Sequence, residues 1–139
     1  MFVGEPNGAS VAASSSGAFD LAGLLARCMD DAAMAAGLLE RFTSRLPVVM
    51  QEIESSIAAS QWSQAASKAH MLKGEAGSLG AAQLQAAAGT LEQSLGRSRP
   101  DAVAEHLVQL KAAAHACLRA RGSALEQLNQ GAVHAPQPW

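Results

Sequence analysis

The sequence predicts an all-α protein, folded as an up-and-down antiparallel four-helix bundle with a short extra helix at its N-terminal side. Three observations lead to this prediction. The chain is rich in alanine and leucine, has no tyrosine and contains only 4% aromatic residues, a composition that favours helices over strands. Apolar residues recur at spacings of three and four, as on one face of an α-helix. Short segments with glycine, serine or proline separate these stretches, as expected for helices that reverse over short links.

The length of the chain, 139 residues, fits one domain that can bury a real core. Residues 1–17 are rich in glycine, serine and alanine, so we expect a disordered lead-in there. The bundle is expected over residues 18–122. Residues 123–139 are expected to form a C-terminal tail, because two of the last four residues are prolines.

Capping residues and apolar spacing define the first two helices. A short amphipathic helix with Asp20 near its start is expected from Leu21, Leu24, Leu25 and Cys28. Asp30 or Asp31 can then cap a longer helix. Its apolar face is predicted to comprise Met34, Leu38, Phe42, Leu46, Val49, Ile53 and Ile57. Pro47 lies within this line and removes one backbone donor, so we expect a local kink there and not a terminus.

The next two helices form a hairpin. The first of them is expected from Gln61, after Ser60, to about Leu79, where Gly80 ends it. The second is expected to end at Gly96. Its apolar face is predicted to comprise Leu84, Ala87, Ala88, Leu91 and Leu95.

The last helix has a strong start signal, because Ser98 can cap it and Pro100 suits its first turn. We expect this helix to end near Gly122. Its buried face is predicted to comprise Val103, Leu107, Leu110, Ala114, Cys117 and Leu118.

Charge and composition exclude several classes of protein. The formal net charge of −2 argues against nucleic-acid binding, which usually requires a basic face. The N-terminal residues lack the charged and apolar regions of a signal peptide, and no stretch approaches the roughly 20 apolar residues that span a bilayer. We therefore expect a cytoplasmic protein without membrane contact. Cys28 and Cys117 are expected to be free, buried, inert thiols.

The segment AHMLKGEAGSLGA, residues 69–81, surrounds a histidine with unusually small side chains. On a helical wheel of about 100° per residue, the core side collects Trp62, Ala65, Ala69, Leu72, Ala76 and Leu79. His70 points away from that side. Its own face is predicted to carry Ser63, Ala66, Ser67, Lys73, Gly74 and Gly77.

This face has the chemistry expected of a phosphoryl acceptor. An interior helical glycine costs roughly 1 kcal/mol relative to alanine, so Gly74 and Gly77 indicate space cleared for an approaching molecule. Lys73, three residues after His70, would place an ammonium near an anion on the imidazole. A nucleophilic nitrogen, a cation and open space suit phosphoryl transfer, which depends on positioning and charge neutralisation.

Glu92 is predicted to lie opposite the histidine. If the chain reverses near Gly80, His70 lies about 15 Å before the turn and Glu92 about 18 Å after it. A carboxylate that accepts the Nδ1 proton would fix the tautomer and leave Nε2 as the nucleophile.

The segment HMLKGEAGSLGAAQLQAAAGTLE resembles the signature of histidine-containing phosphotransfer (Hpt) domains of two-component phosphorelays. The matching positions are His70, Leu72, Lys73, Gly74, Leu79, Gly80, Leu84 and Glu92. The upstream stretch from "DDAAMAAGLLERF" also resembles the family's preceding helix, and the resemblance covers about residues 19–121. Glu75 is a departure, because the family often has a small residue there.

The resemblance implies a bundle that accepts a phosphoryl group from a receiver-domain aspartate and relays it to another response regulator. By position, His70 is the phosphoacceptor, Lys73 the phosphate-facing cation, Gly74 the clearance and Glu92 the residue that orients the imidazole. The protein would be a carrier without kinase activity or a cofactor of its own, and the receiver would bring Mg²⁺. The implied partners are receiver domains or a hybrid sensor histidine kinase, and we expect a monomer.

Two other classes of function stay open. The bundle could be a non-transferring module that holds or regulates a signalling partner, although a scaffold does not need the set His70, Lys73 and Gly74. It could also be part of a sensor kinase, although no Gly-rich nucleotide loop is present. The remaining residues have structural alternatives: Lys73 as a solvated lysine, Glu92 as an edge charge and Gly77 as a packing position.

The other histidines and the methionines are expected to be structural or surface residues. His106, His115 and His134 have no comparable neighbourhood and form no ligand cluster with His70 or the cysteines, so no metal site is expected. The methionines considered as core or rim filler are Met34, Met50 and Met71.

Overall fold

The computed structural model describes residues 16–97 and 99–134. Within them, the elements in order are the 3-10 helix η2 (Ser16–Ala18) and the α-helices α1 (Leu21–Arg27), α2 (Ala32–Ala58), α3 (Trp62–Ser78), α4 (Ala82–Gly96) and α5 (Pro100–Asn129). This confirms the all-α class and the four-helix bundle with a short extra helix. Residues 1–15 of the expected lead-in and the end of the tail, residues 135–139, lie outside the described residues.

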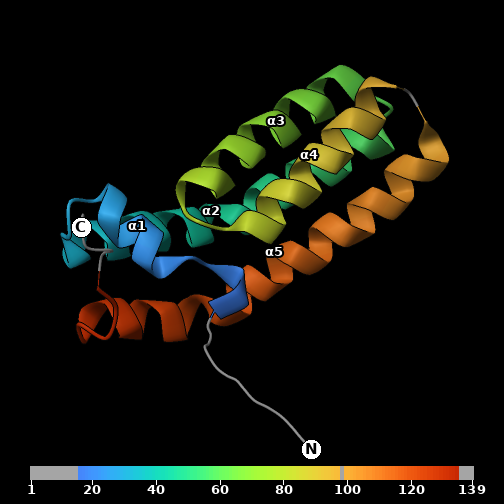
Figure 1. Cartoon of the computed structure of the whole chain (residues 1–139). Coiled ribbons are helices and arrows are strands. Elements are labelled where there is room, and N and C mark those ends of the chain that lie inside the picture. The colour runs from blue at the N-terminus through green and yellow to red at the C-terminus, as the bar shows by residue number, and fades with distance from the viewer. Residues whose placement is uncertain (1–15, 98, 135–139) are drawn as a thin grey trace, which may run out of the picture.

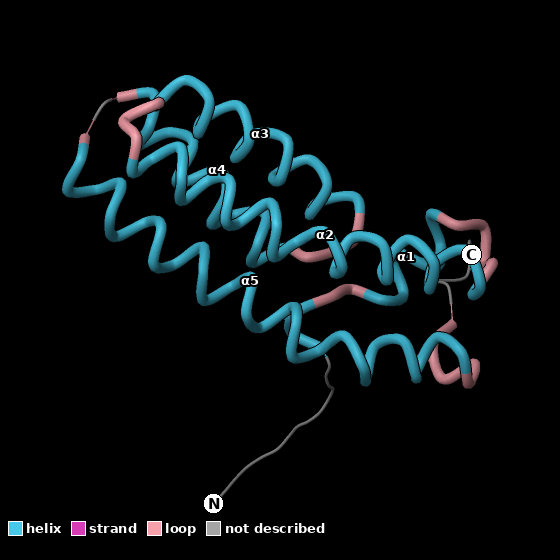
Figure 2. The backbone as a smooth tube through the Cα atoms, turned by 180° about the vertical axis from the view of Figure 1, so that it is seen from behind, coloured by secondary structure: helices cyan, strands magenta, loops and turns pink. Residues whose placement is uncertain are grey.

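The four long helices pack around one core (Figure 1). Helix α3 lies against α2 on one side and α4 on the other, and α5 packs on α4 and α2. Seen from behind, α1 lies at the end of the bundle where α2 begins and α5 finishes (Figure 2). Large side chains that are almost completely buried fill the centre, among them Leu24, Leu39, Leu46, Ile53, Leu72, Leu84, Leu91 and Leu110.

Aspartate caps begin the first two helices, as the sequence predicts. Asp20 accepts a hydrogen bond from the Gly23 amide at 3.1 Å, and Asp31, not Asp30, accepts one from Met34 at 3.0 Å. Helix α2 then runs uninterrupted through Pro47. Pro47 therefore does not end the helix, as predicted.

The rotation of α2 differs from the prediction by one residue at its start. Met34 is 53% exposed and Leu38 only partly buried, whereas Ala35 and Leu39 are fully buried. Both sets have helical spacing, so periodicity alone cannot choose between them. The neighbouring helices α3 and α5 decide which face turns inward.

The last helix is longer than predicted, so the expected end near Gly122 is wrong. Helix α5 continues to Asn129, and the expected tail over residues 123–139 is helical in its first part. Gly122 costs roughly 1 kcal/mol relative to alanine, but the turns beyond it bury Ala124 and Leu128. Burial of this apolar surface offsets that cost.

The start of α5 agrees with the prediction at Pro100. The expected cap Ser98 lies outside the described residues. Arg99 occupies the N-cap position, and its side chain makes no capping hydrogen bond. Pro100 is the first helical residue, as predicted, because its fixed φ suits that position and its missing N–H has no intrahelical partner there.

The turn between α3 and α4 is fixed by contacts with α1 and with the segment that precedes it. Gly80 has φ of +76°, and its carbonyl accepts a hydrogen bond from the Asp20 amide at 2.8 Å. A Cβ at Gly80 would lie 2.8 Å from the Asp20 carbonyl oxygen. Arg27 donates to the Ser78 carbonyl at 3.0 Å. These contacts hold the hairpin in the register that determines which α3 and α4 side chains meet.

Both cysteines are buried and unpaired, as predicted. Burial raises the pKa of the Cys117 thiol to about 11, so this thiol stays protonated and unreactive at neutral pH. In the part of the chain that the structure describes, we find no helix with the length and apolar character needed to cross a bilayer.

Candidate functional site

The structure brings His70 and Glu92 together across the α3–α4 hairpin. Their separation of 22 residues places them at one level, and His70 Nδ1 lies 2.9 Å from Glu92 Oε2. A carboxylate can only accept, so Nδ1 is the donor in this contact. In the neutral ring, Nε2 then keeps its lone pair, and the side chain is 65% exposed. The imidazole is therefore oriented by one nitrogen and accessible at the other.

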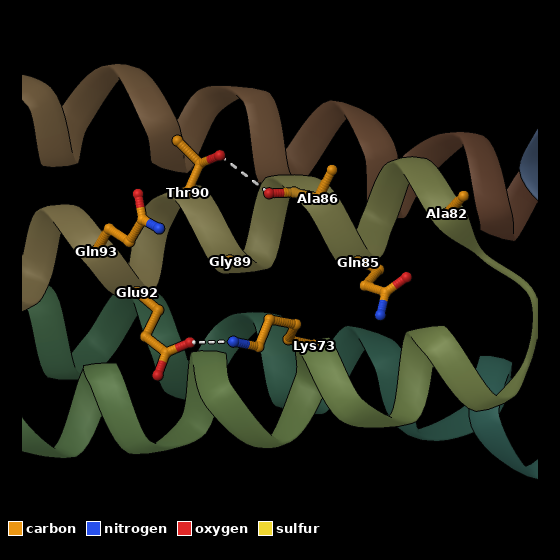
Figure 3. Close-up of a pocket in the computed structure, with 8 residues that line it drawn as sticks. All are labelled: Lys73, Ala82, Gln85, Ala86, Gly89, Thr90, Glu92 and Gln93. Atoms are coloured by element: carbon orange, nitrogen blue, oxygen red, sulfur yellow. Dashed lines mark hydrogen bonds and ion pairs between the residues drawn. The ribbon is translucent and has the colours of Figure 1, made fainter.

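Lys73 completes a three-residue cluster. Its Nζ lies 3.0 Å from Glu92 Oε1 (Figure 3). This is the carboxylate oxygen that His70 does not use. Glu92 thus joins a histidine and a lysine that sit one turn apart on α3. The sequence predicts Lys73 to face an anion on the imidazole, and the structure holds this ammonium beside the ring through Glu92.

Glu92 is ionised under ordinary conditions. Its partial burial raises the pKa of the carboxyl, but hydrogen bonds from Lys73 and His70, together with their charges, outweigh this effect and lower the pKa overall. An ionised carboxylate next to Nδ1 stabilises positive charge on the imidazole. That is the charge that develops when Nε2 attacks an electrophile.

The small residues around His70 occupy two kinds of environment. A Cβ added at Gly74 would have no atom within 4 Å, so this glycine leaves open space one turn from the imidazole. A Cβ at Gly77 would lie 2.5 Å from Gln85 Nε2, so Gly77 faces a side chain of α4. Ser63 and Ser67 are exposed.

Three other residues of α3 near His70 have different environments. Ala66 is partly buried and packs against the core. Glu75, the departure from the family pattern, pairs with Arg45 at 2.9 Å. Because it is paired with Arg45, Glu75 does not enter the His70 cluster. Met71 is 62% exposed, so it does not fill space in the core or at its rim.

A groove beside Lys73 was not predicted from the sequence. It has a volume of about 580 Å³ and is lined by Lys73, Ala82, Gln85, Ala86, Gly89, Thr90, Glu92 and Gln93 (Figure 3). Gly89 is the notable member, because a Cβ there would lie 3.2 Å from Lys73 Cδ. The sequence does contain one indication of this groove, because Gly89 is an interior helical glycine three residues before Glu92. An interior helical glycine was also the reason for selecting Gly74.

The remaining histidines are separate from this cluster. His106 is partly buried, and its Nδ1 contacts the hydroxyl of Ser94. His115 and His134 are exposed. Across residues 16–97 and 99–134, we find no group of three or more histidine, cysteine or acidic side chains that could hold a metal ion.

Comparison with protein families identifies one that matches most of the chain. The model of the Hpt domain matches residues 37–132, which include His70 and Glu92 and extend from α2 to just beyond α5. Hpt domains are phosphoryl carriers that interact with receiver domains and kinases. No curated protein and no solved structure gives a match. Because the family model covers more than half of the sequence, the chain belongs to the Hpt domain family, whose function is histidine phosphotransfer in phosphorelays.

Proposed function

We propose that this protein accepts a phosphoryl group on His70 from a receiver-domain aspartate and relays it to another response regulator. The observation that carries the proposal is the His70 imidazole, whose Nδ1 is held by Glu92 at 2.9 Å while the side chain is 65% exposed. In the forward step the P–O bond to the aspartate breaks and a P–Nε2 bond forms. The second step reverses this exchange on another aspartate.

The neighbouring residues have separate roles in this transfer step. Glu92 holds the ring and stabilises the positive charge that it gains as Nε2 attacks phosphorus. Lys73, already beside the ring, neutralises phosphoryl charge. Gly74 leaves space for the receiver, whose backbone must come close enough for in-line transfer. Ser63, Ala66, Ser67 and Gly77 belong to the surface that the receiver contacts.

The receiver supplies what the bundle does not. Phosphoryl transfer needs a cation that bridges the transferred oxygens, and we expect the receiver's Mg²⁺ to fill that role. The bundle acts as a carrier without kinase activity of its own. We further propose that it is a cytoplasmic monomer that serves receiver domains or a hybrid sensor histidine kinase.

Phosphoryl uptake from a labelled receiver tests this proposal directly. Purified protein mixed with phosphorylated receiver domains should take up one phosphoryl group, and the linkage should be acid-labile and alkali-stable, as a phosphoramidate is. The His70→Gln variant should take up none. Label that persists in His70→Gln would overturn the assignment of His70, and binding without any uptake would favour a module that only holds its partner.

A further inference from the structure

The stem of Lys73 lies over a glycine of the neighbouring helix. Gly89 sits in the interior of α4, three residues before Glu92, so the two share one face of that helix. A Cβ at Gly89 would lie 3.2 Å from Lys73 Cδ. The lysine side chain thus leaves α3, passes over Gly89 and ends on Glu92 Oε1 at 3.0 Å (Figure 3).

This glycine has no evident role in helix formation. Interior glycine costs roughly 1 kcal/mol relative to alanine, and the position lies well inside the Ala82–Gly96 helix. It does not mark a turn, since α4 continues for seven residues beyond it to Gly96. The atom that a Cβ would approach belongs to Lys73, so the space at Gly89 is used by the lysine.

We propose that Gly89 is a positioning residue, which keeps the surface of α4 open so that Lys73 rests on Glu92 beside His70. Lysine has a long, flexible stem and a strongly hydrated ammonium, and without a fixed path it samples many rotamers in water. The open surface at Gly89 gives the stem a path along α4. The effect of this placement on transfer rests on the proposed function of His70.

A larger side chain at position 89 should displace the lysine. A single Cβ requires Lys73 to move by a few tenths of an ångström, because contacts of 3.2 Å are tighter than most. The additional atoms of leucine occupy the path of the stem itself. The ammonium then leaves Glu92, and the carboxylate keeps His70 as its remaining partner.

The first test uses the unphosphorylated protein and needs no transfer. The Glu92 carboxyl is titrated by NMR in the wild type and in Gly89→Leu, Lys73→Ala and Gly96→Leu. Because Lys73 helps to lower the Glu92 pKa, Gly89→Leu should raise this pKa as Lys73→Ala does. Gly96→Leu is the matched control, since a Cβ at Gly96 has no atom within 4 Å, and it should leave the pKa unchanged. An unchanged pKa in Gly89→Leu would overturn the proposal.

The second test is a double-mutant comparison of transfer rates. Gly89→Leu should slow transfer by the same factor as Lys73→Ala, ~10 to 10³-fold, and the double variant should be no slower than Lys73→Ala alone. A further loss in the double variant would mean that Gly89 clears space for the receiver, which contradicts the proposal. If the wild type transfers nothing, the proposed function fails while the titration still decides the role of Gly89.

A second substitution guards against misfolding. If Gly89→Leu loses the helical circular-dichroism spectrum, Gly89→Gln replaces it, because glutamine is a good helix former with a flexible side chain. Gly89→Gln should also raise the Glu92 pKa. A folded Gly89→Gln protein with the wild-type pKa would contradict the proposal.

Discussion

Two histidines of this bundle each have Nδ1 in contact with a side chain of the same helix, α4. His70 contacts the carboxylate of Glu92, and His106 contacts the hydroxyl of Ser94. The first ring projects from the surface, whereas the second is partly buried between α4 and α5.

The difference between these rings lies in the partner and in access. Glu92 is an ionised acceptor that stabilises positive charge on the ring and also holds Lys73. Ser94 is buried, is neutral and also donates to the Thr90 carbonyl at 3.2 Å. We propose that this difference decides which ring accepts a phosphoryl group, because His70 has an anionic partner and an exposed side chain, whereas His106 has a neutral partner and is partly buried.

The largest expected effect separates the two histidines. His70→Gln should abolish phosphoryl uptake, because it removes the attacking nitrogen. His106→Gln should leave uptake at the wild-type rate, because His106 touches none of the three residues of the cluster. Uptake rates from one phosphorylated receiver provide the measurement. Equal losses in the two variants would remove the distinction.

The next effect tests the space around His70. Gly74→Gln should nearly eliminate transfer while the helical spectrum is retained, since the added side chain fills open space beside the imidazole. Helix propensity alone predicts a slight gain in stability. Gly96→Gln is the matched control, with the same substitution away from the ring. Transfer at the wild-type rate in Gly74→Gln would show that this glycine does not serve as clearance.

A smaller effect is expected from the two charges. Lys73→Ala should slow transfer by ~10 to 10³-fold, the upper limit being what one preorganised donor contributes in a buried site. Solvent screens this cation until the receiver docks. Glu92→Ala should slow transfer less, because it orients the ring without contacting the phosphoryl group. Single-turnover rates measure both, and unchanged rates in both single variants and in the double variant would assign all of the electrostatics to the receiver.

The smallest expected effect is on stability, to which His106 should contribute more than His70. His106→Ala should lower the free energy of unfolding by about 1 kcal/mol, because it removes a partly buried hydrogen bond. His70→Ala should change it by less than about 0.5 kcal/mol, as is usual at exposed positions. Urea denaturation measures both values. A larger loss for His70→Ala would mean that the site also stabilises the fold.

Local chemistry made much of this fold predictable. Aspartate caps, the glycine at position 80 and the proline at position 100 act on backbone groups within a few residues, so their effects can be read from the chain. The face shared by His70, Lys73 and Gly74 follows from the geometry of a single helix. The pairing of His70 with Glu92 was predictable as well, because a short hairpin fixes which residues lie at the same level.

Other features depended on contacts between distant parts of the chain. Sequence spacing allowed either Met34 or Ala35 to face inward, and packing against α3 and α5 selected Ala35. The last helix passes Gly122 because its final turns find buried positions for Ala124 and Leu128.

The sequence by itself determined the order of the helices and the face that His70 shares with Lys73 and Gly74, because these depend on backbone geometry over a few residues. The tertiary structure alone decided that Lys73 rests on Glu92 and that its stem passes over Gly89. A long side chain on α3 can follow several directions of similar energy, and only the neighbouring helix supplies both the open surface and the carboxylate that select one of them.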